Sequence, residues 1–429
     1  MDYSTALNFL DNLAFKGIKL GLENTKKILA YLGDPHLVVP TIHIAGTNGK
    51  GSIAAFTESM LRTSGFQIGL FTSPHFLDFR ERIQINRSPI SKSDFASLVS
   101  ELKDAIDNLG VSTTYFEFST ILAFLYFSKK NIDWVVLEVG LGGRLDCTNV
   151  CQPEISIISS ISLDHQSYLG NTIESIAFEK ASIIKNNGTV IAEKQSKEAE
   201  EVILEFAKKQ KANIKFREKD YFVSRKEFNW QGQTFDFESN YGSFKSLKTH
   251  LIGLHQVFNA AVAIETIMSL KEKGHSISTE AVSVGISNCQ WEGRLEVVEQ
   301  EPYLVLDSAH NIDSVKFLTR SIKEHFQYKK CIVILGVMKD KDIEKMGLIL
   351  TEIADRIIIT KPKSERSADP IELKKVLSKT QKAIDIIEEI PYSVGIAKKL
   401  ANPEDLICVT GSLYTIAEAK LFLNNEENS

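Results

Sequence analysis

The chain has 429 residues, a length that predicts two or three domains rather than one. Hydrophobic residues make up 43% and charged residues 24%, a balance that excludes a mainly disordered or fibrous protein. Fifty basic side chains against 55 acidic ones give a net charge of −5, so no overall positive field would hold nucleic acid or an anionic membrane. An anionic ligand would need a local site.

No segment predicts a membrane span or a secretory signal. The apolar run at 121–127 is far shorter than the roughly 20 residues that cross a bilayer. Asp2 and Asp11 interrupt the N-terminal segment, and no basic region precedes it. The five cysteines contain no CxxC pair and predict neither a disulfide framework nor a zinc site. We therefore expect a cytoplasmic protein with no nucleic-acid or membrane partner.

The first half of the chain alternates short β-branched runs with stretches of helical periodicity. This alternation indicates βαβ units and a mostly parallel sheet. The expected strands lie at 41–45, 67–71, 133–139 and 155–160, and the expected helices lie at 51–63, 92–108, 117–129 and 173–184. Residues 221–251 instead predict an antiparallel hairpin around a Gln-Gly turn.

A second alternation begins after Trp291 and predicts a smaller, doubly wound, Rossmann-like domain. The fold class is therefore α/β, with a mostly parallel sheet domain at 1–290 and a C-terminal domain at 291–429. The strands expected in the C-terminal domain lie at 303–306, 330–335, 356–360 and 405–409.

The strongest functional signal is AGTNGKGS at 45–52, between a predicted strand and a predicted helix. Its three glycines permit a backbone whose N–H groups converge on phosphate at a helix N-terminus. Lys50 adds a charge that can reach the β- and γ-phosphates. The combination disfavours the alternative of a glycine-rich turn with an incidental lysine. The loop departs from the Walker A pattern, because Ile44 stands five residues before Gly49 and Gly51 follows the lysine.

The loop form GTNGKGS resembles that of the Mur ligase superfamily of ATP-dependent amide-forming enzymes. Further stretches resemble the folylpolyglutamate synthase/dihydrofolate synthase family and together extend from residue 41 to residue 414. One departure is Ser308, where that family often has glycine. The stretches are TSPHFLDFRERI (72–83), LEVGLGGRLDCTN (137–149), SLDHQSYLGNTIESIAFEKASI (162–183), GLHQVFNAAVA, WEGRLE, LDSAHN (306–311) and TGSLY.

The resemblance implies a bifunctional, monomeric enzyme that joins L-glutamate to dihydropteroate or to reduced folates. ATP would phosphorylate the acceptor carboxylate with Mg²⁺, two ions being expected, and glutamate would attack the acyl phosphate. One alternative is another Mur-type amino-acid ligase, although no further domain is evident before the phosphate loop. A second alternative is a P-loop ATPase that forms no bond. A binding module without catalysis is disfavoured by Lys50, Glu138 and His165.

The resemblance also implies roles for individual residues, of which Lys50, Glu138, His165 and Lys180 would be catalytic. The residues implied for ATP are Gly46, Thr47, Asn48, Gly49, Lys50, Gly51, Ser52, Asn259, Arg294 and Asp307. Those implied for metal are Ser73, Glu138, His165 and Lys180, the lysine as a carbamate. Those implied for the acceptor are Leu20, Gly21, Arg82, Phe116, Glu117, Arg144 and Asp146, and those implied for glutamate are His310 and Ser412.

Taken alone, the residues leave plainer roles open. His165 could be a loop histidine bonded to backbone. Lys180 could extend into solvent or pair with Glu174 or Glu179. Asp307 could cap a helix.

The acceptor residues have equally plain alternatives. Phe116 and Phe118 could alternate along a strand that leads into the next helix. Arg82 could form an exposed ion pair with Glu81 or Asp78.

Overall fold

The computed structural model describes every residue except 14–16, 18, 428 and 429. The chain forms two compact units. The first unit contains Met1–Val223, Phe237–Lys245 and Phe258–Asn288, and the second contains Ser224–Asp236, Ser246–Val257 and Cys289–Ser429. Within the described residues, no helix is long and apolar enough to span a membrane.

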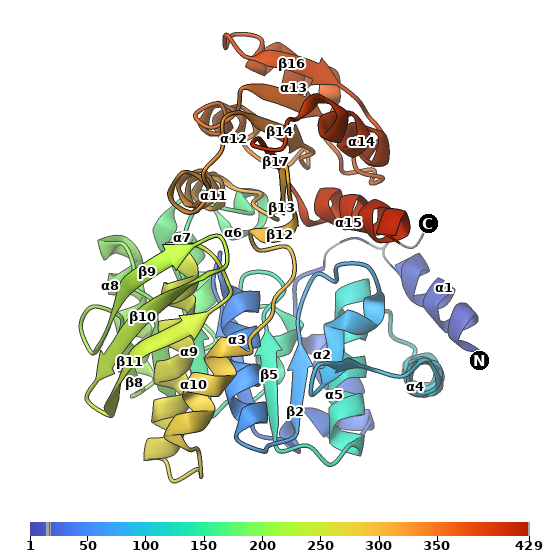
Figure 1. Cartoon of the computed structure of the whole chain (residues 1–429). Helices are drawn as coiled ribbons and strands as arrows, with labels where there is room; N and C mark the ends of the chain where they lie inside the picture. The colour runs from blue at the N-terminus through green and yellow to red at the C-terminus, as the bar shows by residue number, and fades with distance from the viewer. Residues whose placement is uncertain (14–16, 18, 428–429) are drawn as a thin grey trace. The chain divides into compact units, whose positions relative to one another are not determined.

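An eight-stranded sheet organises the first unit (Figure 1). Its order is β4-β3-β2-β5-β1-β6-β7-β8, and the six strands from β2 to β8 in that order run parallel. Only β3 and β4, at one edge, are antiparallel. The mostly parallel sheet is therefore confirmed. The strands are β1 (Thr41–Ala45), β2 (Ile68–Phe71), β3 (Ile83–Ile85), β4 (Ser88–Pro89), β5 (Trp134–Glu138), β6 (Ile155–Ile158), β7 (Thr189–Ala192) and β8 (Asn213–Phe216).

Helices cover this sheet, and its central strands are buried on both faces. Helix α3 packs on β1, β2 and β5, and α10 packs on α3, where Gly285 lets the two helices approach at Met60. The helices are α1 (Tyr3–Leu13), α2 (Glu23–Tyr31), η2 (Pro35–Leu37), α3 (Lys50–Thr63), η3 (Phe79–Arg82), α4 (Lys92–Leu109), α5 (Tyr115–Lys129), η4 (Cys147–Val150), α6 (Gln166–Leu169), α7 (Ile173–Ala181), α8 (Lys197–Lys209), α9 (Leu254–Glu272) and α10 (Thr279–Ser287).

The predicted hairpin at 221–251 is instead a three-stranded antiparallel sheet. The strands are β9 (Tyr221–Asn229), β10 (Gly232–Ser239) and β11 (Gly242–Thr249), in the order β11-β10-β9. The Gln-Gly turn joins β9 to β10 as expected. The prediction missed the second turn, at 240–242, where Gly242 adopts a positive φ of 153°.

The second unit is built on a six-stranded sheet in the order β12-β13-β17-β14-β15-β16. All its pairs are parallel except β12 with β13, so the doubly wound prediction holds apart from that edge. The strands are β12 (Glu296–Gln300), β13 (Tyr303–Leu306), β14 (Cys331–Leu335), β15 (Arg356–Ile359), β16 (Ala383–Ile386) and β17 (Leu406–Thr410). The helices are α11 (Ile312–His325), α12 (Ile343–Leu350), α13 (Pro370–Leu377), α14 (Ile390–Leu400) and α15 (Leu413–Glu427).

Candidate active site

The phosphate loop connects the carboxyl end of β1 to α3, and two of its glycines could not carry a side chain. At Gly46 (φ 152°), an added Cβ would lie 1.7 Å from the Ser159 Oγ atom. At Gly49 (φ 91°), it would lie 2.4 Å from Oδ1 of Asn259. The chain therefore brings Asn259, a predicted nucleotide contact at the start of α9, against the loop itself.

The segment after β6 holds the front half of the loop. The Thr47 N–H donates to the Ser160 carbonyl at 2.8 Å, and the Thr47 hydroxyl donates to the Ser162 carbonyl at 3.1 Å. Asn48 donates through Nδ2 to Ser162 Oγ at 3.3 Å. These bonds join the front half of the loop to residues 160–162.

Lys50, Glu138 and Ser73 come together at the loop from three elements. Lys50 begins α3, and its Nζ donates to the carbonyls of Gly46 at 3.2 Å and Thr47 at 3.3 Å. The same Nζ lies 4.0 Å from Oε1 of Glu138, the last residue of β5. The Glu138 Oε2 atom accepts the Ser73 N–H at 3.1 Å. Parallel β1, β2 and β5 place all three groups at one edge of the sheet.

Lys180 is buried at the same loop, on α7. It is 4% exposed, and its Nζ donates to the Gly46 carbonyl at 2.8 Å. The alternative of a solvent-exposed lysine is therefore wrong. Burial and then the nearby Lys50 charge lower the Lys180 pKa from its ordinary 10.5 to about 7, against an opposing effect of Asp164.

His165 lies after β6, half-buried, with the left-handed φ of 50°. Its N–H is bound by the buried carboxylate of Asp164 at 2.8 Å. Asp164 was not among the predicted site residues, although it is buried and its charge acts on Lys180. The signal was available, because an aspartate follows the strand at 155–158 beside a predicted ligand.

Phe116 and Glu117, which are predicted to contact the acceptor, lie in the first turn of α5, so the strand alternative for Phe116 and Phe118 is wrong. A Cβ added to Gly140 would lie 2.3 Å from Cζ of Phe116, so the Phe116 ring packs directly against this glycine. Glu117 is buried, and its Oε2 accepts the Thr114 N–H at 2.8 Å and the Thr114 hydroxyl at 2.9 Å. This carboxylate completes the capping box that starts the helix.

Arg82 is 7% exposed, so the alternative of an exposed ion pair is wrong. Its Nε donates to Nδ1 of His75 at 2.9 Å, and its guanidinium carbon lies 5.2 Å from the centroid of the Tyr115 ring. Asp78 pairs instead with Arg80, at 2.7 Å.

The loop after β5 carries Arg144 and Asp146. Arg144 pairs with Glu179 of α7 at 2.9 Å. Asp146 is buried, and its carboxylate accepts the N–H groups of Leu141 at 2.8 Å and Thr148 at 3.0 Å. Burial raises the Asp146 pKa, although these bonds oppose the shift.

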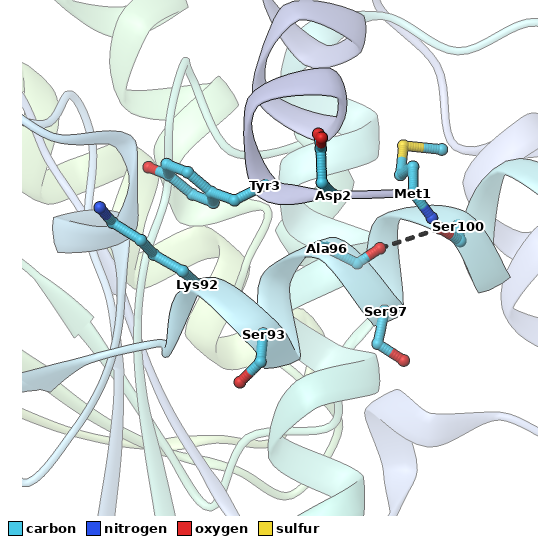
Figure 2. A pocket seen from close by; sticks show the side chains of 8 residues that line it. All are labelled: Met1, Asp2, Tyr3, Lys92, Ser93, Ala96, Ser97 and Ser100. Atoms are coloured by element: carbon cyan, nitrogen blue, oxygen red, sulfur yellow. Dashed lines mark hydrogen bonds between the residues drawn. The ribbon is translucent and has the colours of Figure 1, made fainter.

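The acceptor pair Leu20 and Gly21 lies between α1 and α2, with Leu20 exposed. A separate pocket of about 590 Å³ lies between α1 and α4 (Figure 2). No predicted site residue lines it, since its walls are residues 1–3 and the α4 residues Lys92, Ser93, Ala96, Ser97 and Ser100.

In the second unit, Asp307 follows β13 and accepts the N–H groups of Leu295 and Ala309, both at 2.9 Å. The helix-cap alternative for Asp307 is wrong, because Asn311 caps α11. Burial raises the Asp307 pKa, while the charge of Arg294 opposes this.

The remaining second-unit predictions gather around the same loop. Arg294 donates to Ser308 Oγ, and Nδ1 of His310 lies 2.9 Å from the Ser308 carbonyl. The Gly411 N–H donates to the Ala309 carbonyl at 3.1 Å, which joins this loop to the one carrying Ser412. The buried Ser412 hydroxyl lies 2.8 Å from Thr415 Oγ1.

A glycine-rich loop between a parallel strand and a helix, with lysines and a strand-end carboxylate beside it, defines a P-loop nucleotide-binding enzyme. Residues 44–267 match the Mur ligase middle domain, and residues 293–413 match the Mur ligase, glutamate ligase domain.

Relatives that match over nearly their whole length identify the family within this class of enzymes. The chain is 35% identical to the dihydrofolate synthase/folylpolyglutamate synthase of Bacillus subtilis, over 97% of this chain and 98% of that protein. It is 30% identical to the Escherichia coli protein of the same name, over 96% and 93%. The chain therefore belongs to the dihydrofolate synthase/folylpolyglutamate synthase family of Mur ligases and is an ATP-dependent glutamate ligase.

Solved structures agree with this assignment. Folylpolyglutamate synthase of Mycobacterium tuberculosis, complexed with ADP and AMPPCP, superposes with a TM-score of 0.92 at 27% identity, over 98% of this chain and 99% of that one. E. coli FolC, in complex with DHPP and ADP, gives a TM-score of 0.90 at 29% identity, over 100% and 99%.

Proposed function

We propose that this ligase adds L-glutamate both to dihydropteroate and to reduced folates that already carry glutamate. The observation that carries the proposal is the meeting of Lys50, Glu138, Ser73 and Lys180 at a phosphate loop, in a chain whose full-length relatives bear both activity names. The domain at 1–290 would bind ATP and the acceptor. The domain at 291–429 would bind glutamate.

The reaction needs two bond changes. A carboxylate oxygen of the acceptor attacks the γ-phosphorus and ADP leaves. The α-amino nitrogen of glutamate then attacks the acyl carbon, phosphate leaves and the nitrogen loses a proton. Lys50 and the N–H groups of the phosphate loop would stabilise charge on the transferring phosphoryl group, so no nucleophilic side chain is needed.

The residues that match family contacts to ATP come from several segments of the sequence. We propose that residues Gly46 to Ser52 hold the phosphates and that the amide of Asn259 contacts adenine. In the second unit, the Arg294 guanidinium would bind phosphate and the Asp307 carboxylate would bind ribose. His310 and Ser412 would bind the incoming glutamate, and the bonded loops around Ala309 support that grouping.

Two oxygen-bearing side chains beside the loop support a magnesium proposal. Glu138 offers a buried carboxylate. Ser73 already donates its N–H to that carboxylate, and its hydroxyl offers a second oxygen. We propose that Ser73, Glu138 and His165 hold one Mg²⁺ and that Lys180, as a carbamate, holds a second. Bound magnesium would neutralise phosphate charge.

The carbamate proposal is supported by the burial of Lys180. Carbamate formation joins the neutral amine nitrogen to CO₂ and releases a proton. A buried ammonium without a carboxylate partner is unfavourable, and the Lys180 Nζ donates to a carbonyl. The modification would replace that cation with oxygen ligands beside the phosphate loop.

For the acceptor, we propose direct contact by Arg82, Phe116 and Arg144 together with Leu20 and Gly21. Arg82 would meet a substrate carboxylate, and Phe116 would offer an aromatic face. Glu117 and Asp146 would shape this site, since their carboxylates are occupied by backbone N–H groups.

One assay tests the proposal. ADP release is measured with dihydropteroate and with tetrahydrofolate, each with and without L-glutamate. We expect glutamate-dependent ADP release with both acceptors and a product one glutamate heavier by mass spectrometry. ADP release that ignores glutamate would contradict ligation, and turnover with only one acceptor would contradict bifunctionality. Light scattering should give the mass of a single chain, as the monomer proposal requires.

A further inference from the structure

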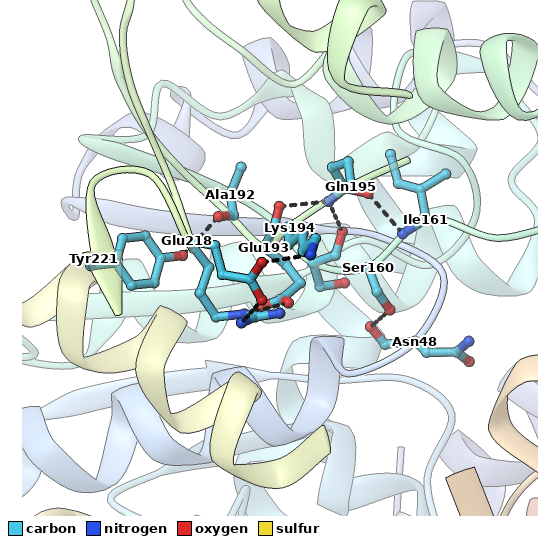
Figure 3. A network of polar contacts seen from close by, with 11 residues as sticks. Asn48, Ser160, Ile161, Ala192, Glu193, Lys194, Gln195, Glu218 and Tyr221 are labelled. Carbon is cyan, nitrogen blue, oxygen red and sulfur yellow. Dashed lines mark hydrogen bonds and ion pairs between the residues drawn. The ribbon is translucent and has the colours of Figure 1, made fainter. Parts of the chain in front are cut away.

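The carboxyl end of β7 carries a glutamine that ties two strand ends together. The Gln195 Nε2 atom donates to the carbonyls of Ser159 at 3.0 Å and Glu193 at 3.1 Å. Its Oε1 accepts the Ile161 N–H at 3.2 Å. Figure 3 shows Gln195 beside Ile161 and the segment of Glu193. A single side chain thus satisfies three backbone groups at the ends of β6 and β7.

The segment that Gln195 binds is the segment that holds the phosphate loop. Gln195 binds the backbone of Ser159 and Ile161, whereas Thr47 binds the backbone of Ser160 and Ser162. The two sets of bonds therefore alternate along four consecutive residues. A shift of this segment away from β7 would carry Thr47 with it, because its N–H and hydroxyl are both bound there.

A second contact leads from the same strand end to the other side of the loop. Glu193 is 7% exposed and accepts from Nε of Arg217 at 2.6 Å. The guanidinium carbon of Arg217 lies 3.9 Å from the ring centroid of Phe258. The next residue, Asn259, is the one whose amide lies against Gly49.

We propose that Gln195 is a positioning residue for ATP, acting through residues 159–162 on the phosphate loop, and that Arg217 acts likewise through Phe258 on Asn259. This inference rests on the proposed role of the loop as the ATP site. Each residue would act on the geometry of the loop through the segment that it binds. A nucleotide binds more tightly when the N–H groups that contact it are already oriented, because less free energy is lost in ordering them.

The chemistry of the amide makes the proposal specific. Gln195 donates to two carbonyls and accepts from one N–H, a pattern that a carboxylate cannot reproduce. In the variant Gln195→Glu, an oxygen would face the carbonyls of Ser159 and Glu193 and repel them. The variant Gln195→Met keeps the length of the side chain and removes every hydrogen bond. The matched control is Gln327→Glu, the same change at an exposed position of the second unit.

The test measures KM for ATP, L-glutamate and tetrahydrofolate, together with ADP affinity by calorimetry, in variants whose folding is checked by thermal unfolding. In Gln195→Glu we expect about a tenfold rise in the ATP KM and the ADP Kd, matching the loss of one or two hydrogen bonds. The KM values for glutamate and tetrahydrofolate should stay at the wild-type level. Gln195→Met and Arg217→Met should shift the ATP values in the same direction by a smaller factor.

Two results would overturn the proposal. One is a folded Gln195→Glu protein with wild-type ATP KM and ADP Kd. The other is a purely structural effect, seen as equal changes in all three KM values or as failure of both Gln195 variants to fold. The variant Lys50→Ala, measured in parallel, distinguishes a failure of the Gln195 proposal from a failure of the assignment of the loop as the ATP site. If Lys50→Ala also binds ADP like the wild type, the ATP site lies elsewhere.

Discussion

Two groups of polar side chains in the first unit use their hydrogen bonds differently. At the phosphate loop, Lys50 and Glu138 lie 4.0 Å apart, at the distance limit of an ion pair. Among the residues predicted to contact the acceptor, the carboxylates of Glu117 and Asp146 accept hydrogen bonds from the backbone around them. Glu138 accepts one backbone N–H, from Ser73, and its other oxygen lies near a lysine, whereas Glu117 and Asp146 each accept both an N–H and a hydroxyl group of neighbouring threonines.

The difference teaches that a motif match does not reveal what a carboxylate does. All four residues fit family motifs equally well. A carboxylate that accepts backbone N–H groups stabilises the fold, and its removal leaves buried donors without partners. We therefore expect substitutions at the phosphate loop to reduce turnover and substitutions on the acceptor side to reduce stability.

The largest expected effect is that of Lys50→Ala. Turnover should fall about 10²–10³-fold, because the charge that stabilises the phosphoryl group is lost. The free energy of unfolding, measured in urea, should change by only about 1 kcal/mol, since the lysine gives up hydrogen bonds to the half-exposed loop. Lys197→Ala, on the exposed surface of α8, is the control. Near-wild-type turnover in Lys50→Ala would contradict the loop assignment.

Glu138→Gln comes next and should also lower turnover, by about tenfold to a hundredfold, because an amide is a weaker magnesium ligand than a carboxylate. Raising the Mg²⁺ concentration should recover part of the loss. The measurement is turnover against Mg²⁺ concentration for wild type and variant. An unchanged magnesium dependence would contradict the proposed ligand role.

Lys180→Met tests a group that lies at the phosphate loop and is also buried. The folded-state pKa of about 7 lies below the ordinary 10.5, so between these values the folded protein binds fewer protons than the unfolded chain. Stability should therefore rise with pH from 7 to 10 in CO₂-free buffer, and Lys180→Met should flatten that rise. With bicarbonate, carbon-13 NMR should show a carbamate in the wild type only. Wild type and variant curves of equal slope would contradict the buried neutral amine.

Sequence reasoning recovered the architecture of this protein because the signals were local. The β-branched runs around 41–45 and 155–158 and the glycines of the phosphate loop act over a few residues. It missed contacts between distant segments. The burial of Lys180 depends on the carbonyl of Gly46, 134 residues away, and nothing on the helix itself indicates it.

The same limit applies to Glu117 and Asp146. The spacing of Thr114 and Glu117 is that of a capping box, but the family resemblance implies that Glu117 contacts the acceptor, and the capping role was not predicted. Gln195 was missed for a different reason. Its contacts join the ends of β6 and β7, and only the strand order brings those ends together.

Asp146→Ala should lower stability more than it lowers turnover. The partly buried N–H group of Leu141 and the buried N–H group of Thr148 would lose their acceptor, and the free energy of unfolding should fall by about 1–3 kcal/mol. Turnover per folded molecule should change less than in Lys50→Ala. Asp104→Ala, an exposed position of α4, is the control for the urea measurement. A stable Asp146→Ala enzyme with a greatly raised KM for the acceptor would instead indicate direct contact.

The smallest expected effect is that of Glu117→Ala, which sharpens the comparison most. Loss of one half of the capping box should lower the free energy of unfolding by about 1 kcal/mol, because the Thr114 N–H loses its acceptor. Thr114→Ala should lower it by a similar amount, and the double variant should lose less than the sum, since both changes break one interaction. The KM for tetrahydrofolate should stay near that of the wild type in all three. Additive stability losses, or an acceptor KM that rises in Glu117→Ala but not in Thr114→Ala, would show that the carboxylate contacts substrate rather than completing the helix start.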